Sequence, residues 1–181
     1  MTPSAATYSV SARAFHWVTA LIVIFMIVAG ILMLNMPDGP IPDALYTLHR
    51  SVGICLIPIA FARLFYRMTW TAPPLPADLP AVQQFAAHFV QASLYILIIV
   101  QPLIGWIATS AYRAPISMFW LFDMPPIWPE DRAFSDRMFR VHAIAGYLMA
   151  ALICAHIAGA LFHHVIRKDN VLMRMLTGRA A

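Results

Sequence analysis

Long runs of apolar residues, separated by shorter stretches rich in proline and charge, dominate the chain. Between Arg13 and Asp38 no residue is charged. This run of 24 positions exceeds the roughly 20 that a helix needs to cross the hydrocarbon core of a bilayer. Three further runs follow the same pattern. We therefore predict four membrane-spanning helices, at approximately residues 14–35, 46–66, 83–109 and 139–165.

Proline marks the connections between these helices. Of the 14 prolines, 12 lie in the N-terminal tail or between predicted spans, where a residue without a backbone N–H breaks a helix. Pro58 and Pro102 lie within spans, where proline is tolerated. The outer connection, 110–138, is the one with room for a short surface helix. We expect a single membrane domain over residues 1–181, all-α, built as a transmembrane four-helix bundle.

The charged residues indicate an orientation. Four spans place both termini on one side, and that side holds seven of the 12 Lys and Arg residues; the other holds five, with six of the eight acidic residues. Lys and Arg are in excess on the cytoplasmic side of membrane proteins, so we predict that both termini are cytoplasmic. The terminal-side cations are Arg13, Arg63, Arg67, Arg167, Lys168, Arg174 and Arg179; those opposite are Arg50, Arg113, Arg132, Arg137 and Arg140.

Composition narrows the class of protein. The chain is 61% hydrophobic and 11% charged, against roughly 25% charged in soluble domains, which excludes a disordered segment and argues against a soluble enzyme. The net charge of +4 is spread among the span ends, so no nucleic-acid partner is indicated. Cys55 and Cys154 lie in apolar runs and suggest no disulfide or thiolate site. The chain has no Cys-x-x-Cys-His motif for covalent haem attachment.

The histidines are unusually many, seven against eight acidic residues. His142 and His156 are 14 residues apart in the fourth span, which is about 21 Å of rise and nearly four turns, so they share one helix face at two depths. His16 begins the first span at the inner level, and His49 begins the second at the outer level. Ionisable residues inside a membrane usually mark a functional path.

Paired inward histidines at two depths are what a four-helix bundle needs to hold two b-type haems, each with one axial nitrogen from either face. By depth alone, His49 pairs with His142. The partner of His16 is open by depth among His88, His156 and His163. His156 shares a face with His142, whereas His163 and His164 lie close to the inner boundary, where a headgroup or structural contact is an equal alternative to a substrate site.

The chain resembles the bacterial cytochrome b561 family of di-haem four-helix membrane proteins, specifically its superoxide oxidase type. The resemblance extends from Tyr8 to Met175. It rests on Ser11-Ala12-Arg13-Ala14-Phe15-His16-Trp17, His49-Arg50-Ser51-Val52-Gly53, His142 with His156, and His163-His164-Val165-Ile166-Arg167-Lys168-Asp169-Asn170. It implies that His16 and His156 are the axial ligands of an inner haem iron, and that His49 and His142 are those of an outer one.

The same resemblance implies a superoxide:ubiquinone oxidoreductase of the bacterial inner membrane, which oxidises superoxide to dioxygen at the outer face and passes electrons through two b haems to ubiquinone. The expected partners are the lipid bilayer, superoxide and ubiquinone, with no partner protein required. Arg50 and Arg140 adjoin ligand histidines, so we expect them to contact haem propionates. The outer arginines either attract the superoxide anion or are ordinary loop charges balanced by acidic neighbours.

A quinone head group needs a hydrogen-bond donor and a proton source within reach of lipid. His163, His164 and Lys168 at the inner boundary meet this description, and Arg13 or His88 could join them.

Two other functions fit less well. One is a quinone-linked cytochrome b subunit that transfers electrons for a dehydrogenase or hydrogenase partner. The other is a Zn or Cu transporter, which the lack of acidic residues within the spans disfavours.

Overall fold

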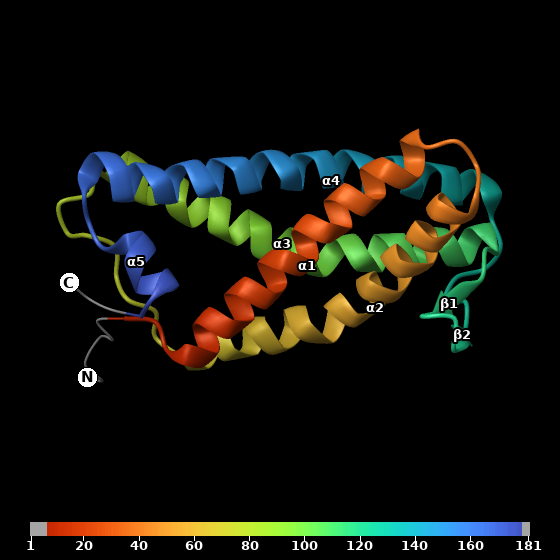
Figure 1. Ribbon diagram of the computed structural model, residues 1–181, viewed down its shortest axis with the longest axis horizontal. Coiled ribbons are helices and arrows are strands. Elements are labelled where there is room, and N and C mark those ends of the chain that lie inside the picture. The colour runs from red at the N-terminus through yellow and green to blue at the C-terminus, as the bar shows by residue number, and fades with distance from the viewer. Residues whose placement is uncertain (1–6, 179–181) are drawn as a thin grey trace.

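The structure, a computed structural model, describes residues 7–178, so Arg179 of the charge count lies outside the described residues. Four long helices form an elongated bundle (Figure 1), and all four are long and apolar enough to cross a membrane. The predicted all-α bundle is confirmed. The helices are α1 (Val10–Asn35), α2 (Pro40–Thr69), α3 (Ala81–Tyr112) and α4 (Arg132–Leu161).

The helices extend beyond the expected spans, because they continue past the apolar runs into polar sequence. α2 begins at Pro40, since proline is well suited to the first turn of a helix, where its missing N–H costs nothing. α4 begins at Arg132 because Asp131 caps it, with Oδ1 accepting a hydrogen bond of 2.8 Å from the N–H of Phe134. Pro58 and Pro102 lie inside α2 and α3.

The connection between α3 and α4, which has room for a short surface helix, holds a β-hairpin instead. Strands β1 (Ile116–Met118) and β2 (Phe122–Met124) pair antiparallel. Ile116 and Met118 are buried and Ser117 between them is not, the period-two alternation of a strand. The hairpin is tied to α2 by the fully buried Ser51, whose hydroxyl accepts a 2.8 Å hydrogen bond from the N–H of Phe119.

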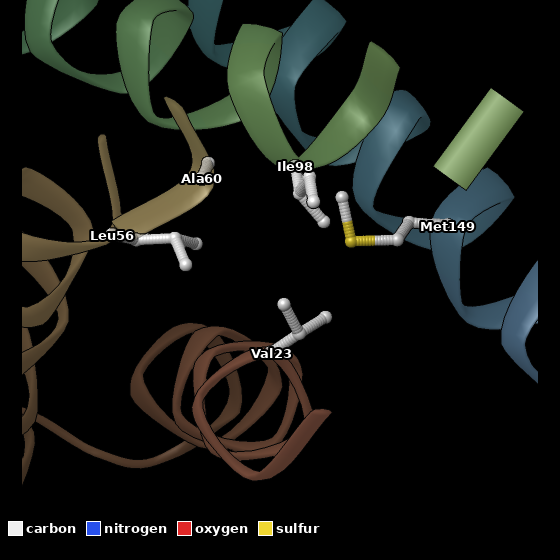
Figure 2. Packing of buried hydrophobic residues seen from close by; sticks show 5 residues of the cluster. All are labelled: Val23, Leu56, Ala60, Ile98 and Met149. Atoms are coloured by element: carbon white, nitrogen blue, oxygen red, sulfur yellow. The ribbon is translucent and has the colours of Figure 1, made fainter. Parts of the chain in front are cut away.

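A buried apolar cluster lies in the middle of the bundle and takes side chains from all four helices (Figure 2). On α4, Met149 lies seven residues after His142 and seven before His156, so the cluster separates the two levels at which the histidines lie. Its members are Val23, Leu56, Ala60, Ile98 and Met149.

The end of the bundle opposite the hairpin is closed by the C-terminal part of the chain (Figure 1). α4 continues into the π-helix η1 (Phe162–Arg167), and the chain then turns back through α5 (Val171–Leu176). α5 is fastened to the start of α1 by two hydrogen bonds to its carbonyls: Arg13 Nη1 donates to Leu176 O and Trp17 Nε1 to Met175 O, each at 3.3 Å.

Candidate functional site

The structure brings four of the predicted histidines together as two facing pairs. His16 of α1 faces His156 of α4, with 6.0 Å between ring centroids, and His49 of α2 faces His142 of α4 at 6.1 Å. The first pair lies near the start of α1, and the second near the hairpin, which is hydrogen-bonded to Ser51 two residues after His49. We name them the inner pair (His16 and His156) and the outer pair (His49 and His142), after the predicted orientation. His156, and neither His88 nor His163, is therefore the residue opposite His16.

The separation of the rings fits a metal ion held between them. An imidazole nitrogen binds a divalent metal at about 2 Å and lies about 1 Å from the ring centre, so two rings on opposite sides of one ion have centres about 6 Å apart. Within residues 7–178 no group of three or more His, Cys, Asp or Glu side chains is placed to hold a metal ion. Two facing imidazoles suit an iron whose remaining ligands belong to its own macrocycle.

Glycine makes the room for both rings of the outer pair. A Cβ added at Gly30 of α1 would lie 3.3 Å from His49 Cε1, and one added at Gly105 of α3 would lie 3.2 Å from His142 Cε1. Each ring thus lies directly against the backbone of a neighbouring helix. A larger residue at either glycine would push a histidine out of its present position.

The ring of His142 is oriented by α3. Its Nδ1 donates to the backbone carbonyl of Gln101 at 3.1 Å, and the Gln101 side chain donates back to the carbonyl of His142 at 3.0 Å. A proton on Nδ1 leaves Nε2 free to bind a metal, the usual way in which a second contact fixes the tautomer of a ligand histidine. Buried polar atoms normally have partners, yet Gln101 Oε1 and Trp106 Nε1 have none within the described chain. The His49 ring has only a long contact with the backbone of Met26, outside hydrogen-bond geometry for its Nδ1.

The inner pair lies beside a positive charge. Nη2 of Arg63, from α2, is 3.2 Å from Nδ1 of His16, and the edge of Trp17 contacts the same ring at 5.1 Å between centroids. A guanidinium has only donors, so Nδ1 accepts here and the neutral ring carries its proton on Nε2. A neutral ring that bound a metal through Nε2 would carry its proton on Nδ1 instead, and Nδ1 could then no longer accept from Arg63. The two histidine pairs therefore differ in what holds their rings.

The two arginines expected at haem propionates lie at the outer end but differ in their contacts. Arg50 is half-buried; its Nη1 donates to the carbonyl of Pro115 at 3.0 Å, and its guanidinium lies 5.4 Å from the ring centre of Tyr46. Arg140 is exposed on α4. Nearby, a cavity of about 150 Å³ lies beside the hairpin and is lined by Ser110, Arg113, Ala114, Pro115, Ile116, Met124 and Pro126.

Of the residues expected at a quinone site, His163 is buried, and its Nδ1 bonds Asp169 Oδ2 at 2.6 Å. Arg167 bridges Asp169 and Asp78, at 3.3 and 2.7 Å. Burial alone would raise the pKa of the Asp169 carboxyl, but hydrogen bonds from His163, the Val171 N–H and Arg167 outweigh it and hold that pKa below its ordinary value.

The other four residues of that set are dispersed. His164 follows His163 but is exposed, as is Lys168, which ends η1 in the left-handed conformation with φ 56°. His88 is exposed on α3. Arg13 is engaged by the carbonyl of Leu176. The structure therefore separates the expected set into one buried histidine with its carboxylate, three exposed groups and the half-buried Arg13.

Sequence reasoning missed the residues that support the histidines. Arg63 was counted as a charge at the end of the second span, although α2 continues to Thr69 and places Arg63 inside the helix. The sequence signal was available, because a charge one or two turns before the end of a helix lies within membrane depth. Gly30 and Gly105 gave no comparable signal, since glycine in an apolar run does not reveal which side chain approaches it.

Comparison with known proteins identifies relatives over nearly the whole chain. A family model described as prokaryotic cytochrome b561 matches residues 7–178. Two proteins of Escherichia coli (strain K12) are similar. "Cytochrome b561 homolog 2" is 34% identical over 172 residues, which cover 93% of this chain and 90% of the relative. "Cytochrome b561 homolog 1" is 32% identical over 168 residues, which cover 91% of this chain and 93% of the relative. "Probable superoxide oxidase CybB" of Yersinia pestis is 26% identical over 170 residues, 93% of this chain and 95% of the relative.

Proposed function

Since the chain belongs to the prokaryotic cytochrome b561 family, a family of membrane electron-transfer proteins with b-type haem, we propose that it oxidises superoxide to dioxygen at its outer face and delivers the electrons to ubiquinone. The proposal includes two haems per chain, cytoplasmic termini and a bacterial inner membrane. The relative at 26% identity whose name is "Probable superoxide oxidase" supports the choice of superoxide. The two E. coli relatives support the family and leave the donor open.

The observation that carries the proposal is the pair of facing histidines at each of two depths. In our assignment His16 and His156 bind the iron of the inner haem, and His49 and His142 that of the outer haem. Bound haem would supply one-electron redox chemistry at both depths. A haem iron held by two of these histidines would keep no open position for oxygen, which favours electron transfer over oxygenation.

At the outer face the residues have to attract a small anion. Arg113 and Arg132 both approach Glu130, at 3.8 and 4.0 Å, so their charges are partly neutralised. Arg50, Arg137 and Arg140 form no salt bridge within residues 7–178. We assign to these three the attraction of superoxide, and to Arg50 and Arg140 also the haem propionates.

The reaction balances as two one-electron oxidations and one two-electron reduction. Two superoxide anions each lose one electron and become dioxygen. One ubiquinone gains both electrons and two protons and becomes ubiquinol. The protons have to be taken up at the quinone, so that site needs a group that can donate them.

We assign this role to the inner boundary. His163 is held by Asp169 through Nδ1, which leaves Nε2 to meet a quinone oxygen, in the way that a carboxylate orients a catalytic histidine. His164, Lys168, Arg13 and His88 are the further candidates there. The exposure of His164 and Lys168 suits groups that receive protons from the aqueous phase and pass them inwards.

The first experiment measures the haems and the reaction. The purified protein should show reduced-minus-oxidised b-type bands and two haems per chain; His49→Ala and His156→Ala should each lose one. With enzymatically generated superoxide it should form one ubiquinol for every two superoxide anions consumed. A colourless protein, or a di-haem protein that reduces quinone no faster with superoxide than without it, would contradict the proposal.

The quinone site is tested by His163→Gln and His164→Gln. Both should keep two haems, and the rate of ubiquinol formation should fall at least tenfold in His163→Gln. Reduction of the haems by superoxide, followed optically without quinone, should be unchanged in that variant. Native quinone turnover in both variants would remove His163 and His164 from the site.

A second candidate function is electron transfer on behalf of a soluble dehydrogenase or hydrogenase. The hairpin favours it, because Phe119, Trp120, Leu121 and Phe122 at its tip are all exposed, and apolar surface of this kind is typical of protein contacts. Stable co-purification of a redox partner at stoichiometric amounts, lost on Trp120→Ser, would support this candidate over the first.

A further inference from the structure

Arg63 is a cation inside a membrane helix, and it has no acidic partner among residues 7–178. It lies half-buried in α2. The salt bridges within residues 7–178 involve Arg113, Arg132, His163 and Arg167, and none of them includes Arg63. A charge at such a position is costly and tends to be kept for a function. The residues around it do not cancel its charge.

The position of the guanidinium is set by oxygen atoms around His16. Nη1 donates to the backbone carbonyls of Phe15 at 3.2 Å and of His16 at 3.4 Å, and Nε donates to the hydroxyl of Tyr95 at 3.3 Å. The ring centre of Tyr95 lies 5.1 Å from Arg63 Cζ. These contacts anchor the charge beside His16 whichever nitrogen of His16 carries a proton.

At the outer pair no cation is hydrogen-bonded to a histidine ring within residues 7–178. The charge of Arg50 acts on His49 at longer range, whereas that of Arg63 acts on both His16 and His156. The guanidinium of Arg50 donates to the carbonyl of Pro115, and the proposed haem propionate beside it would offset its charge. On the other side, the Nδ1 of His142 faces the neutral carbonyl of Gln101. One histidine pair therefore has a cation in contact with a ring, whereas the other has a neutral carbonyl.

We propose that Arg63 raises the reduction potential of the inner haem site above that of the outer one, so that an electron received at the outer face comes to rest on the quinone side. The inference rests on the proposed function, in which these pairs bind haem. Reduction adds one electron, breaks no bond and lowers the charge of the site by one, so a fixed positive charge favours the reduced form. At an effective dielectric constant of about 20, a unit charge about 10 Å away shifts such an equilibrium by roughly ten- to twentyfold.

The test is a potentiometric titration of the haem-loaded protein, followed by its b-type bands. Arg63→Gln should lower the reduction potential of one haem by at least about 59 mV, which is a tenfold change in the equilibrium constant of a one-electron reduction. The potential of the other haem should be unchanged. Arg67→Gln is the matched control, since Arg67 is exposed one turn further along α2 and should shift the same haem much less. In the His49→Ala background only the inner haem remains, which assigns the shift.

Three outcomes would overturn the inference: an inner potential that is unchanged or higher in Arg63→Gln, an equal shift of both haems, or an equal effect of Arg67→Gln. If Arg63→Gln loses the inner haem, two variants that keep Arg63 provide the test. His49→Ala, which retains only the inner haem, must then have a higher reduction potential than His156→Ala, which retains only the outer haem. Equal or reversed values would overturn it. A protein that binds no haem would instead contradict the proposed function.

Discussion

Gly105 offers a sharp test of the outer site, because it touches a histidine that the proposal makes a ligand. A Cβ added there would lie 3.2 Å from His142 Cε1 and 3.5 Å from its Nδ1. The first distance is shorter than the 3.4–4 Å of an ordinary contact. The ring would have to move by a few tenths of an ångström. It is held by the hydrogen bond of 3.1 Å from Nδ1 to Gln101 O, so this movement strains the contact that orients it.

Overpacking of this kind costs about 1 to 3 kcal/mol. Since about 1.4 kcal/mol is tenfold in an equilibrium constant, Gly105→Ala should weaken binding of the outer haem by roughly five- to 150-fold. The inner haem should be unaffected, because His156 lies 14 residues further along α4, about 21 Å of helix rise. Gly30→Ala should have a similar effect through His49, where the added Cβ would lie 3.3 Å from Cε1.

The matched control is Gly159→Ala. Gly159 is also a glycine inside a long helix, but nothing lies within 4 Å of its Cβ position, and both variants gain the same helix preference of alanine, about 1 kcal/mol. The measurements are haem per chain at limiting haem and the reduced-minus-oxidised spectrum. If Gly105→Ala binds two haems as tightly as Gly159→Ala, with an unchanged spectrum, the proposed fit of His142 against α3 is refuted.

Three further predictions concern the ends of the bundle. Ser51→Ala leaves the N–H of Phe119 without its buried acceptor and should lower the unfolding free energy by about 1 to 3 kcal/mol. Proteolysis of the 113–131 connection should become faster. An unchanged rate of proteolysis would contradict the role of Ser51 in anchoring the hairpin. The depressed pKa of Asp169 contributes stability that is complete above its unfolded-state pKa and is lost as pH falls through its folded-state pKa. Thermal unfolding should therefore show native protein more stable than Asp169→Asn at neutral pH, with the difference vanishing in acid; a constant difference would refute the linkage. At the C-terminus, a fused reporter that is active only in the cytoplasm should be active, and one that is active only outside the inner membrane should not. Labelling of that end from outside intact cells would contradict the predicted orientation.

The four helices and the two histidine levels were predictable because both depend on local regularities. An apolar run long enough for a membrane indicates a helix, and the spacing of His142 and His156 fixes their shared face without knowledge of the other helices. The placement of His156 opposite His16 was left open by depth, since it depends on how α1 and α4 are rotated against each other. The hairpin was not predicted from the sequence, because its strands are only three residues long and lie within a stretch whose prolines suggested only loops.

His163 is a case in which a usable signal was passed over. It lies seven residues after His156, which itself follows Met149 by seven, and seven residues are close to two turns of helix. The same face that carries His142 and His156 therefore also carries His163, and the structure buries it there. Its proximity to Arg167 and Lys168 suggested an interfacial position, but a charge a few residues further along a helix does not decide which way the preceding side chain faces.

The two sites share one helix and differ in how their rings are held, and this difference bears on direction. α4 supplies a histidine to both levels, so the helix itself gives them equivalent surroundings. The difference comes from the neighbours. The outer ring of His142 lies against glycine backbone and a neutral carbonyl, whereas the inner ring of His16 lies beside a guanidinium that forms no salt bridge within residues 7–178. Packing can hold a ring in place without favouring either redox state, whereas a nearby charge necessarily favours one. An electron carrier that has to deliver to one side needs such a bias, and Arg63 is the residue that can supply it at the inner pair.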